Sequence, residues 1–173
     1  MERLRSPLYA QIELTYACNL ACNHCYNEPR FSNTNGIIKF NRVKRENTES
    51  DRFIDIAQEL VRHDVFAVTL TGGEVFTARD RLYSTIEVLA SSGLEVTLNS
   101  NLTLVSEDDV KRLRDSGVNG IMTSLLSYNP EVHDKIVNKQ GAHKRTVEGT
   151  ELMLRNGIYV SSNMVVSKAN KDD

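Results

Sequence analysis

The chain has 173 residues, with 21 basic and 23 acidic side chains and a formal net charge of −2. That length suits a single domain with its own core, and the nearly balanced charge excludes a general nucleic-acid or membrane-surface binder. The N-terminus lacks the apolar centre of a signal peptide, and no apolar run approaches the roughly 20 residues of a membrane span. We therefore expect a cytoplasmic protein in which residues 1–173 form one domain, with neither nucleic acid nor membrane as a partner.

The first element in chain order is a strand that ends at a cluster of cysteines. Residues 8–15 alternate between apolar and polar side chains, which predicts a β-strand. All three cysteines follow it on one short loop, as Cys18, Cys22 and Cys25. Three such thiolates can bind three corners of a [4Fe-4S] cluster and leave the fourth iron open for chemistry. The alternative is a zinc site with His24 as a fourth ligand, but zinc ligands usually come as two separated pairs.

A polar stretch and a second strand come next. We expect residues 27–47 to form a long exposed insertion, and the next four residues to cap a helix whose apolar side chains recur at helical spacing. Residues 65–70 predict the second strand, which ends at Gly72, Gly73 and Glu74. On its own, this segment indicates only a tight turn with a solvated glutamate.

The rest of the chain repeats one pattern of helix, glycine and strand. Strands are expected at roughly residues 95–98, 120–126 and 158–166, each after an amphipathic helix that ends at a glycine. Strands that alternate with helices at this pace predict a parallel sheet with right-handed crossovers. We therefore predict an α/β fold, a partial (β/α) barrel of about five βα units, with functional residues at the C-terminal ends of the strands.

Two of these segments together resemble those of a known family. The motif Cys-x3-Cys-x2-Cys after a strand, with the ring of His24 before the last cysteine, is similar to that of the radical S-adenosylmethionine (SAM) enzymes, and residues 71–74 resemble their Gly-Gly-Glu segment. The resemblance runs from about residue 8 to residue 170. It implies a barrel of six βα units and an enzyme whose cofactors are a [4Fe-4S] cluster and SAM. Reductive cleavage of SAM would yield a 5′-deoxyadenosyl radical that abstracts hydrogen from the substrate.

The resemblance also implies which residues bind SAM. Gly72 and Gly73 would let the backbone approach the cofactor, and Glu74 would accept a hydrogen bond from its ammonium group. The further cofactor-binding positions that match the family pattern are His24, Asn101, Ser124 and Asn163. The alternative role is an Asx turn for Asn101, a buried serine for Ser124 and a polar residue inside the barrel for Asn163.

Some positions depart from the family pattern. Leu102 stands where glycine is usual, and Leu126 stands where an aspartate is common. Val137 occupies the position of an arginine that could hold the SAM carboxylate. Either Lys139 replaces that arginine or the contact is absent.

Residues 133–136 and 141–149 resemble the peptide-modifying, SPASM-type branch of the family. This implies a peptide or protein substrate and an electron donor such as a flavodoxin or a ferredoxin. One alternative is a small-molecule or haem-type substrate, and another is a catalytically incomplete fragment that binds the cluster or SAM. A third is a zinc-binding interaction domain. Because the chain ends after the fifth expected strand, we favour a C-terminally truncated radical SAM core domain, or half of a split enzyme that a second chain completes.

Overall fold

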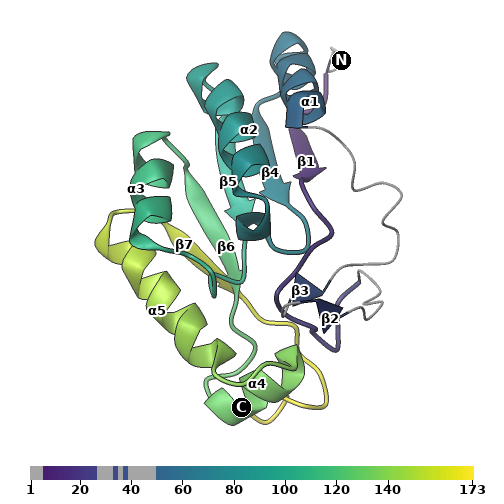
Figure 1. Cartoon of the computed structure of the whole chain (residues 1–173), viewed down its shortest axis with the longest axis vertical. Helices are drawn as coiled ribbons and strands as arrows, with labels where there is room; N and C mark the ends of the chain where they lie inside the picture. The colour runs from purple at the N-terminus through teal and green to yellow at the C-terminus, as the bar shows by residue number, and fades with distance from the viewer. Residues whose placement is uncertain (1–5, 27–32, 35–36, 39–49) are drawn as a thin grey trace, which may run out of the picture.

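The computed structural model describes residues 6–26, 33–34, 37–38 and 50–173 (Figure 1). Two expectations fall mainly outside these ranges, namely the insertion at 27–47 and the first half of the helix cap that follows it. Helix α1 (Ser50–Arg62) begins within the expected cap and confirms the helix predicted there.

Two short strands lie within the expected insertion. They are β2 (Asn33–Thr34) and β3 (Ile37–Ile38), which pair antiparallel. The sequence between them is Asn-Gly, which favours a two-residue hairpin turn. The hairpin therefore has a local sequence signal that our expectation of a plain insertion did not use.

Five parallel strands form the main sheet, in the order β1-β4-β5-β6-β7. This arrangement confirms the predicted α/β fold of the partial-barrel type. The strands end at one edge of the sheet, beside helix α4 (Pro130–Val137; Figure 1). Their bounds are β1 (Tyr9–Glu13), β4 (Ala67–Thr71), β5 (Glu95–Asn99), β6 (Gly120–Ser124) and β7 (Val160–Asn163).

The longer helices connect successive strands and cover one face of the sheet (Figure 1). Helix α1 is joined there by α2 (Arg79–Ser91), α3 (Glu107–Asp115) and α5 (Ala142–Arg155). A 3-10 turn, η2 (Val75–Thr77), precedes α2. No described helix is long and apolar enough to cross a membrane.

Local sequence explains where these helices begin and end. Ser106 and Asp109 form a capping box at the start of α3, in which each side chain accepts the backbone N–H of the other residue. The predicted helix-ending glycines all take left-handed backbone angles, with φ of 82° at Gly93, 78° at Gly117 and 78° at Gly157.

The strands alternate between an apolar and a polar face. The side chains that face the helices are fully buried, and each contributes about 1.5–3 kcal/mol by leaving water; they include Val68, Leu70, Val96 and Leu98. Side chains two residues apart on a strand share a face, and those of the other face are mainly polar, as at Gln11, Thr71, Asn99 and Ser124. Parallel strands buried on both faces are instead continuously apolar. The polar face therefore lines a site rather than a second core.

The last two strands are shorter than predicted. β6 ends at Ser124 because the chain then turns, and the N–H of Leu126 donates to the imidazole Nδ1 of His133 at 3.2 Å. β7 pairs with β6 only from Val160 to Asn163. Because β6 ends at Ser124, the apolar residues after Asn163 have no neighbouring part of β6 with which to pair.

Candidate active site

A cavity of about 300 Å³ opens at the C-terminal edge of the sheet, between the strand ends and the cysteine loop. Its wall is built from segments far apart in the sequence, which the parallel topology brings to one edge. All the predicted metal- and cofactor-binding residues except Glu74 line it: Cys18, Cys22, His24, Cys25, Gly72, Gly73, Asn101, Ser124 and Asn163.

The three cysteines are free thiols on one wall of this cavity. Burial raises the pKa of Cys18 to about 12 and that of Cys22 to about 11. Because iron binds the thiolate, loading a cluster must release protons from these groups. Among the described residues, no three Cys, His, Asp or Glu side chains are arranged to hold a single metal ion. Thiolate sulfur is the ligand that iron–sulfur clusters take, so three thiols facing one cavity fit a [4Fe-4S] cluster with one open iron.

Gly72 and Gly73 bring the end of β4 against the segment that leads into the cysteine loop. The N–H of Gly73 donates to the carbonyl of Thr15 at 2.7 Å, and the next N–H donates to the carbonyl of Ala17 at 2.8 Å. A Cβ atom at Gly72 would lie 2.4 Å from the Thr15 oxygen, and one at Gly73 would lie 2.3 Å from the Ala17 oxygen. The glycines are therefore required for contact with the cysteine loop itself, besides lining the cavity.

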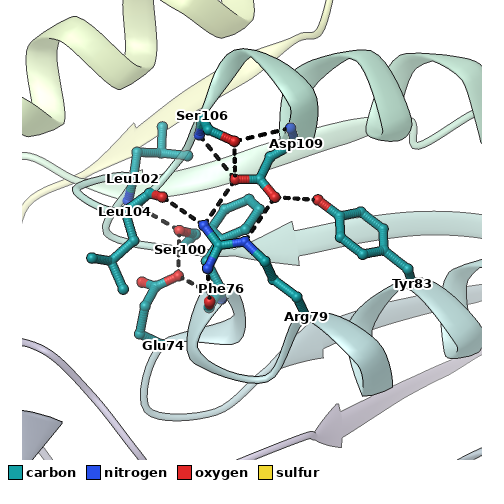
Figure 2. Close-up of polar contacts among 9 residues, drawn as sticks. All are labelled: Glu74, Phe76, Arg79, Tyr83, Ser100, Leu102, Leu104, Ser106 and Asp109. Atoms are coloured by element: carbon teal, nitrogen blue, oxygen red, sulfur yellow. Dashed lines mark hydrogen bonds and ion pairs between the residues drawn. The ribbon is translucent and has the colours of Figure 1, made fainter.

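Glu74 is fully buried, and its carboxylate forms hydrogen bonds with neighbouring segments (Figure 2). Its Oε1 accepts hydrogen bonds from Phe76 N at 3.1 Å and Ser100 Oγ at 2.8 Å, and its Oε2 accepts one from Asn101 N at 2.8 Å. Burial raises the pKa of this carboxyl, and these hydrogen bonds oppose the rise. The carboxylate faces the loop after β5 and does not line the cavity, so its contact with the SAM ammonium stays a prediction.

Asn101 links that loop to the cysteine loop. Its side-chain Oδ1 accepts from the N–H of Thr103 at 2.9 Å, which is the Asx turn considered as an alternative role. Its Nδ2 donates to Oδ1 of Asn19 at 3.0 Å and lies 4.0 Å from Sγ of Cys18. Asn101 therefore combines the turn with a place on the cavity wall.

Ser124 and Asn163 lie opposite each other at the ends of β6 and β7. Both line the cavity. Within the described ranges, neither side chain has a hydrogen-bond partner. They are available to a ligand, and the predicted buried serine is not observed, since Ser124 is only partly buried.

A second network, which the sequence did not predict, lies beside Glu74 (Figure 2). The Arg79 guanidinium donates to both carboxylate oxygens of Asp109, each at 2.9 Å, and to the carbonyls of Phe76 and Leu104. The hydroxyl of Tyr83 donates to Asp109 at 2.6 Å. Burial alone would raise the pKa of Asp109, but the hydrogen bonds, led by that of Arg79, lower it to about 2. The network joins the turn after β4 to the loop after β5.

The described lining of the cavity includes no Lys, Arg, Asp or Glu side chain. Val137 lines it, whereas Lys139, the suggested replacement for the missing arginine, does not. The carboxylate of Glu13 lies outside this lining and accepts a hydrogen bond at 3.0 Å from the hydroxyl of Tyr26 on the cavity wall. Leu126, in place of the usual aspartate, is fully buried in an apolar cluster under the cysteine loop.

The sequence matches the family model of the Radical SAM superfamily over residues 12–173. The AdoMet-dependent heme synthase of Methanosarcina barkeri is 30% identical over 97% of this chain and 45% of its own length. The subtilosin biosynthesis protein AlbA of Bacillus subtilis is 29% identical over 95% of this chain and 34% of its own length. The mycofactocin maturase MftC of Mycolicibacterium smegmatis is 29% identical over 98% of this chain and 40% of its own. The chain thus spans about a third to a half of the length of these relatives.

Solved structures share the fold at lower identity. SuiB of Streptococcus suis, bound to S-adenosylmethionine, superposes with a TM-score of 0.76 at 17% identity, over 95% of this chain and 35% of that one. The FeFe-hydrogenase maturase HydG from Carboxydothermus hydrogenoformans gives a TM-score of 0.60 at 15% identity, over 90% of this chain and 36% of that one.

The family match extends over nearly the whole chain, including the end of β1, the cysteine loop, the Gly-Gly-Glu segment and the other four strands of the main sheet. The superfamily uses a [4Fe-4S] cluster and SAM, and the three thiols at one cavity fit such a cluster. The family match therefore rules against the alternative of a zinc-binding interaction domain. This chain belongs to the radical SAM superfamily of enzymes.

Proposed function

We propose that this chain is the core of a radical SAM enzyme that holds a [4Fe-4S] cluster through Cys18, Cys22 and Cys25. When bound, the reduced cluster supplies one electron that cleaves SAM to methionine and a 5′-deoxyadenosyl radical, which abstracts hydrogen from the substrate. The observation that carries the proposal is the single cavity that the three thiols share with the strand ends. The chain's own residues hold SAM, seat the substrate beside it and exclude water.

The binding of SAM depends on neutral groups of the cavity. The backbone of Gly72 and Gly73, and the side chains of Asn101, Ser124 and Asn163, offer hydrogen bonds along one wall. An oxidised [4Fe-4S] cluster on three thiolates carries one net negative charge, and zwitterionic SAM carries one net positive charge on its sulfonium. Because the described lining carries no formally charged side chain, none of its residues competes with the attraction between the cluster and SAM.

A peptide is the substrate that the polar face of the sheet favours. Glu13, at the C-terminal end of β1, shares that face with Gln11 and Asn99, because residues two apart on a strand point the same way. No lysine or arginine occupies this face in the described strands. Haem precursors and GTP carry carboxylates or phosphates, which such a face would repel. A neutral or cationic peptide segment meets no such repulsion.

The relatives divide between these substrate classes, and two lines support the peptide. AlbA and MftC are, by their names, a bacteriocin biosynthesis protein and a maturase. SuiB, whose fold is similar, was solved with its precursor peptide SuiA. The heme synthase keeps a haem-type substrate as the second candidate, because its identity of 30% is as high as that of the maturases.

The first experiment is anaerobic reconstitution of the natural polypeptide with iron and sulfide, followed by EPR of the reduced protein with and without SAM. We expect a [4Fe-4S]⁺ signal that changes shape with SAM, and formation of 5′-deoxyadenosine. The control is the variant with all three cysteines replaced by alanine, which should bind no cluster. A cluster indifferent to SAM would identify the incomplete, cluster-binding fragment instead.

The substrate class needs its own measurement. The reconstituted protein, with a flavodoxin or ferredoxin as electron donor, is incubated with SAM and either unmodified peptides, a porphyrin carboxylate or GTP. The readout is the increase in 5′-deoxyadenosine over the rate without substrate. A rise with peptides alone supports a maturase, and a rise only with the porphyrin contradicts it.

A further inference from the structure

The C-terminus of helix α4 ends against the middle of the cysteine loop. The last carbonyls of a helix have no partner within the helix. Here the N–H of Ala21 donates to the carbonyl of Val137 at 3.1 Å, and the N–H of Asn23 donates to the carbonyl of Ile136 at 2.9 Å. These two N–H groups flank Cys22, so the end of α4 fixes the backbone on both sides of this cysteine.

Asn138 completes this contact. It ends α4 in the left-handed conformation, with φ of 54° and ψ of 39°, which turns its side chain back toward the loop. Its Nδ2 donates to the carbonyl of Ala21 at 2.7 Å and to Oδ1 of Asn23 at 2.6 Å. Nδ2 of Asn23 in turn lies 3.4 Å from the carbonyl of Lys135. The final three carbonyls of the helix therefore all accept from the cysteine loop.

Helix α4 is itself held firmly enough to serve as a support. The Asp134 carboxylate accepts the N–H groups of Gly141 and His143, which ties α4 to the start of α5. Leu20 of the cysteine loop packs in one apolar cluster with Ile136 and Val137 of α4. The loop thus packs on a helix that the start of α5 holds in place.

The other cysteines are held differently. The chain before Cys18 pairs with the Gly-Gly-Glu segment, and the side chain of Asn101 lies beside its sulfur. The N–H of Cys25 donates to the carbonyl of Cys22 at 3.1 Å, so its position depends on that of Cys22. The contact with α4 therefore places Cys22 directly and Cys25 through it.

We propose that Asn138 is a positioning residue for the cluster, which holds Cys22 in the place needed to bind iron. The role rests on the proposed function, because it concerns the cluster that this function requires. The residue does not touch the cluster, and it acts through Ala21 and Asn23.

Two variants distinguish the effect of the Asn138 amide from that of its left-handed backbone conformation. Asn138→Gly keeps the left-handed conformation but removes the amide, and Asn138→Asp keeps the size but presents a carboxylate to two oxygens that need a donor. The matched control is Asn156→Ala, which removes an asparagine amide bonded to a helix carbonyl at 2.8 Å at the far end of α5. Circular dichroism of the metal-free proteins tests whether each variant folds.

The first readout is the rate of iron loss from the reconstituted protein to a chelator. Asn138→Gly removes two hydrogen bonds, and the loss of each, at about 0.5–1.5 kcal/mol, should speed iron loss by about two- to tenfold. Iron loss should be faster still in Asn138→Asp. Asn156→Ala should lose iron at the wild-type rate. Equal rates in wild type and both Asn138 variants would overturn the proposal.

The second readout needs no cluster. In the metal-free protein, alkylation by iodoacetamide is followed at each cysteine by mass spectrometry. Asn138→Gly should speed alkylation at Cys22 and Cys25 and leave Cys18 unchanged. If the wild-type protein binds no cluster, the proposed function fails, but this pattern still decides whether Asn138 positions the loop. Uniform alkylation of all three cysteines would contradict that role.

Discussion

The carboxylate Oε2 of Glu74 accepts the backbone N–H of Asn101 at 2.8 Å, although the two residues follow different strands. Through this bond the Gly-Gly-Glu segment, which pairs with the chain before Cys18, also fixes the loop after β5. The side chain of Asn101 then returns to the cysteine loop at Asn19. One buried carboxylate therefore orients two walls of the cavity at once.

Replacing Glu74 with glutamine should loosen both walls. The amide nitrogen would face either Asn101 N–H or Ser100 and Phe76, so at least one buried donor would lose its acceptor. An unsatisfied buried group costs about 1–3 kcal/mol, and we expect that loss in urea unfolding of the metal-free protein. SAM affinity should fall as well. Unchanged stability with weaker SAM binding would instead indicate direct contact with the cofactor.

The Gly73→Ala variant tests the contact between the two segments. Its Cβ would meet the Ala17 oxygen at 2.3 Å, so the chain before Cys18 must move. We expect a clear drop in iron bound after reconstitution, measured by iron and sulfide analysis. Gly117→Ala is the control, because its φ of 78° makes it strained by about 1 kcal/mol while nothing lies within 4 Å of the added Cβ. Normal iron content in Gly73→Ala would contradict this prediction.

Acid should weaken the fold through Asp109. Its pKa is lowered from 3.8 to about 2, so the carboxylate stabilises the folded state above the unfolded pKa, and this stability is lost as pH falls from about 4 toward 2. The shift corresponds to about 2 kcal/mol. Asp109→Asn should be less stable at pH 7 and should show a flatter stability curve below pH 4. Parallel curves for the two proteins would show that Asp109 does not titrate in this way.

Alanine at Ser124 or Asn163 tests whether these side chains bind SAM. Neither has a side-chain hydrogen bond within the described residues, so stability should change by less than about 0.5 kcal/mol. Each lost hydrogen bond should weaken SAM binding by up to about tenfold, which calorimetry on the reconstituted protein measures. Destabilisation without weaker binding would assign them a structural role.

The sequence predicted what depends on local periodicity and spacing. The cysteine spacing and the glycine-ended helices are local signals, and parallel topology then places the strand ends of Ser124 and Asn163 beside the cysteines. The direction of the Glu74 carboxylate was not predictable, because it depends on a loop 26 residues away.

The supports of the site were missed for the same reason. Arg79 and Asp109 are 30 residues apart, and Asn138 meets Ala21 across 117 residues. No pattern in the sequence pairs such residues, since ordinary surface arginines and asparagines look the same. The hairpin of β2 and β3 is different, because its Asn-Gly pair was a readable signal.

The alternation along each strand separates stability from specificity. Val68 and Leu98 face the helices, while neighbours one residue away face the cavity side. Natural selection can therefore exchange every second residue of a strand without disturbing the packed layer beneath it. A scaffold of this kind is expected to diversify in substrate faster than in fold, which is how one architecture comes to be shared by proteins named for haem, peptides and GTP.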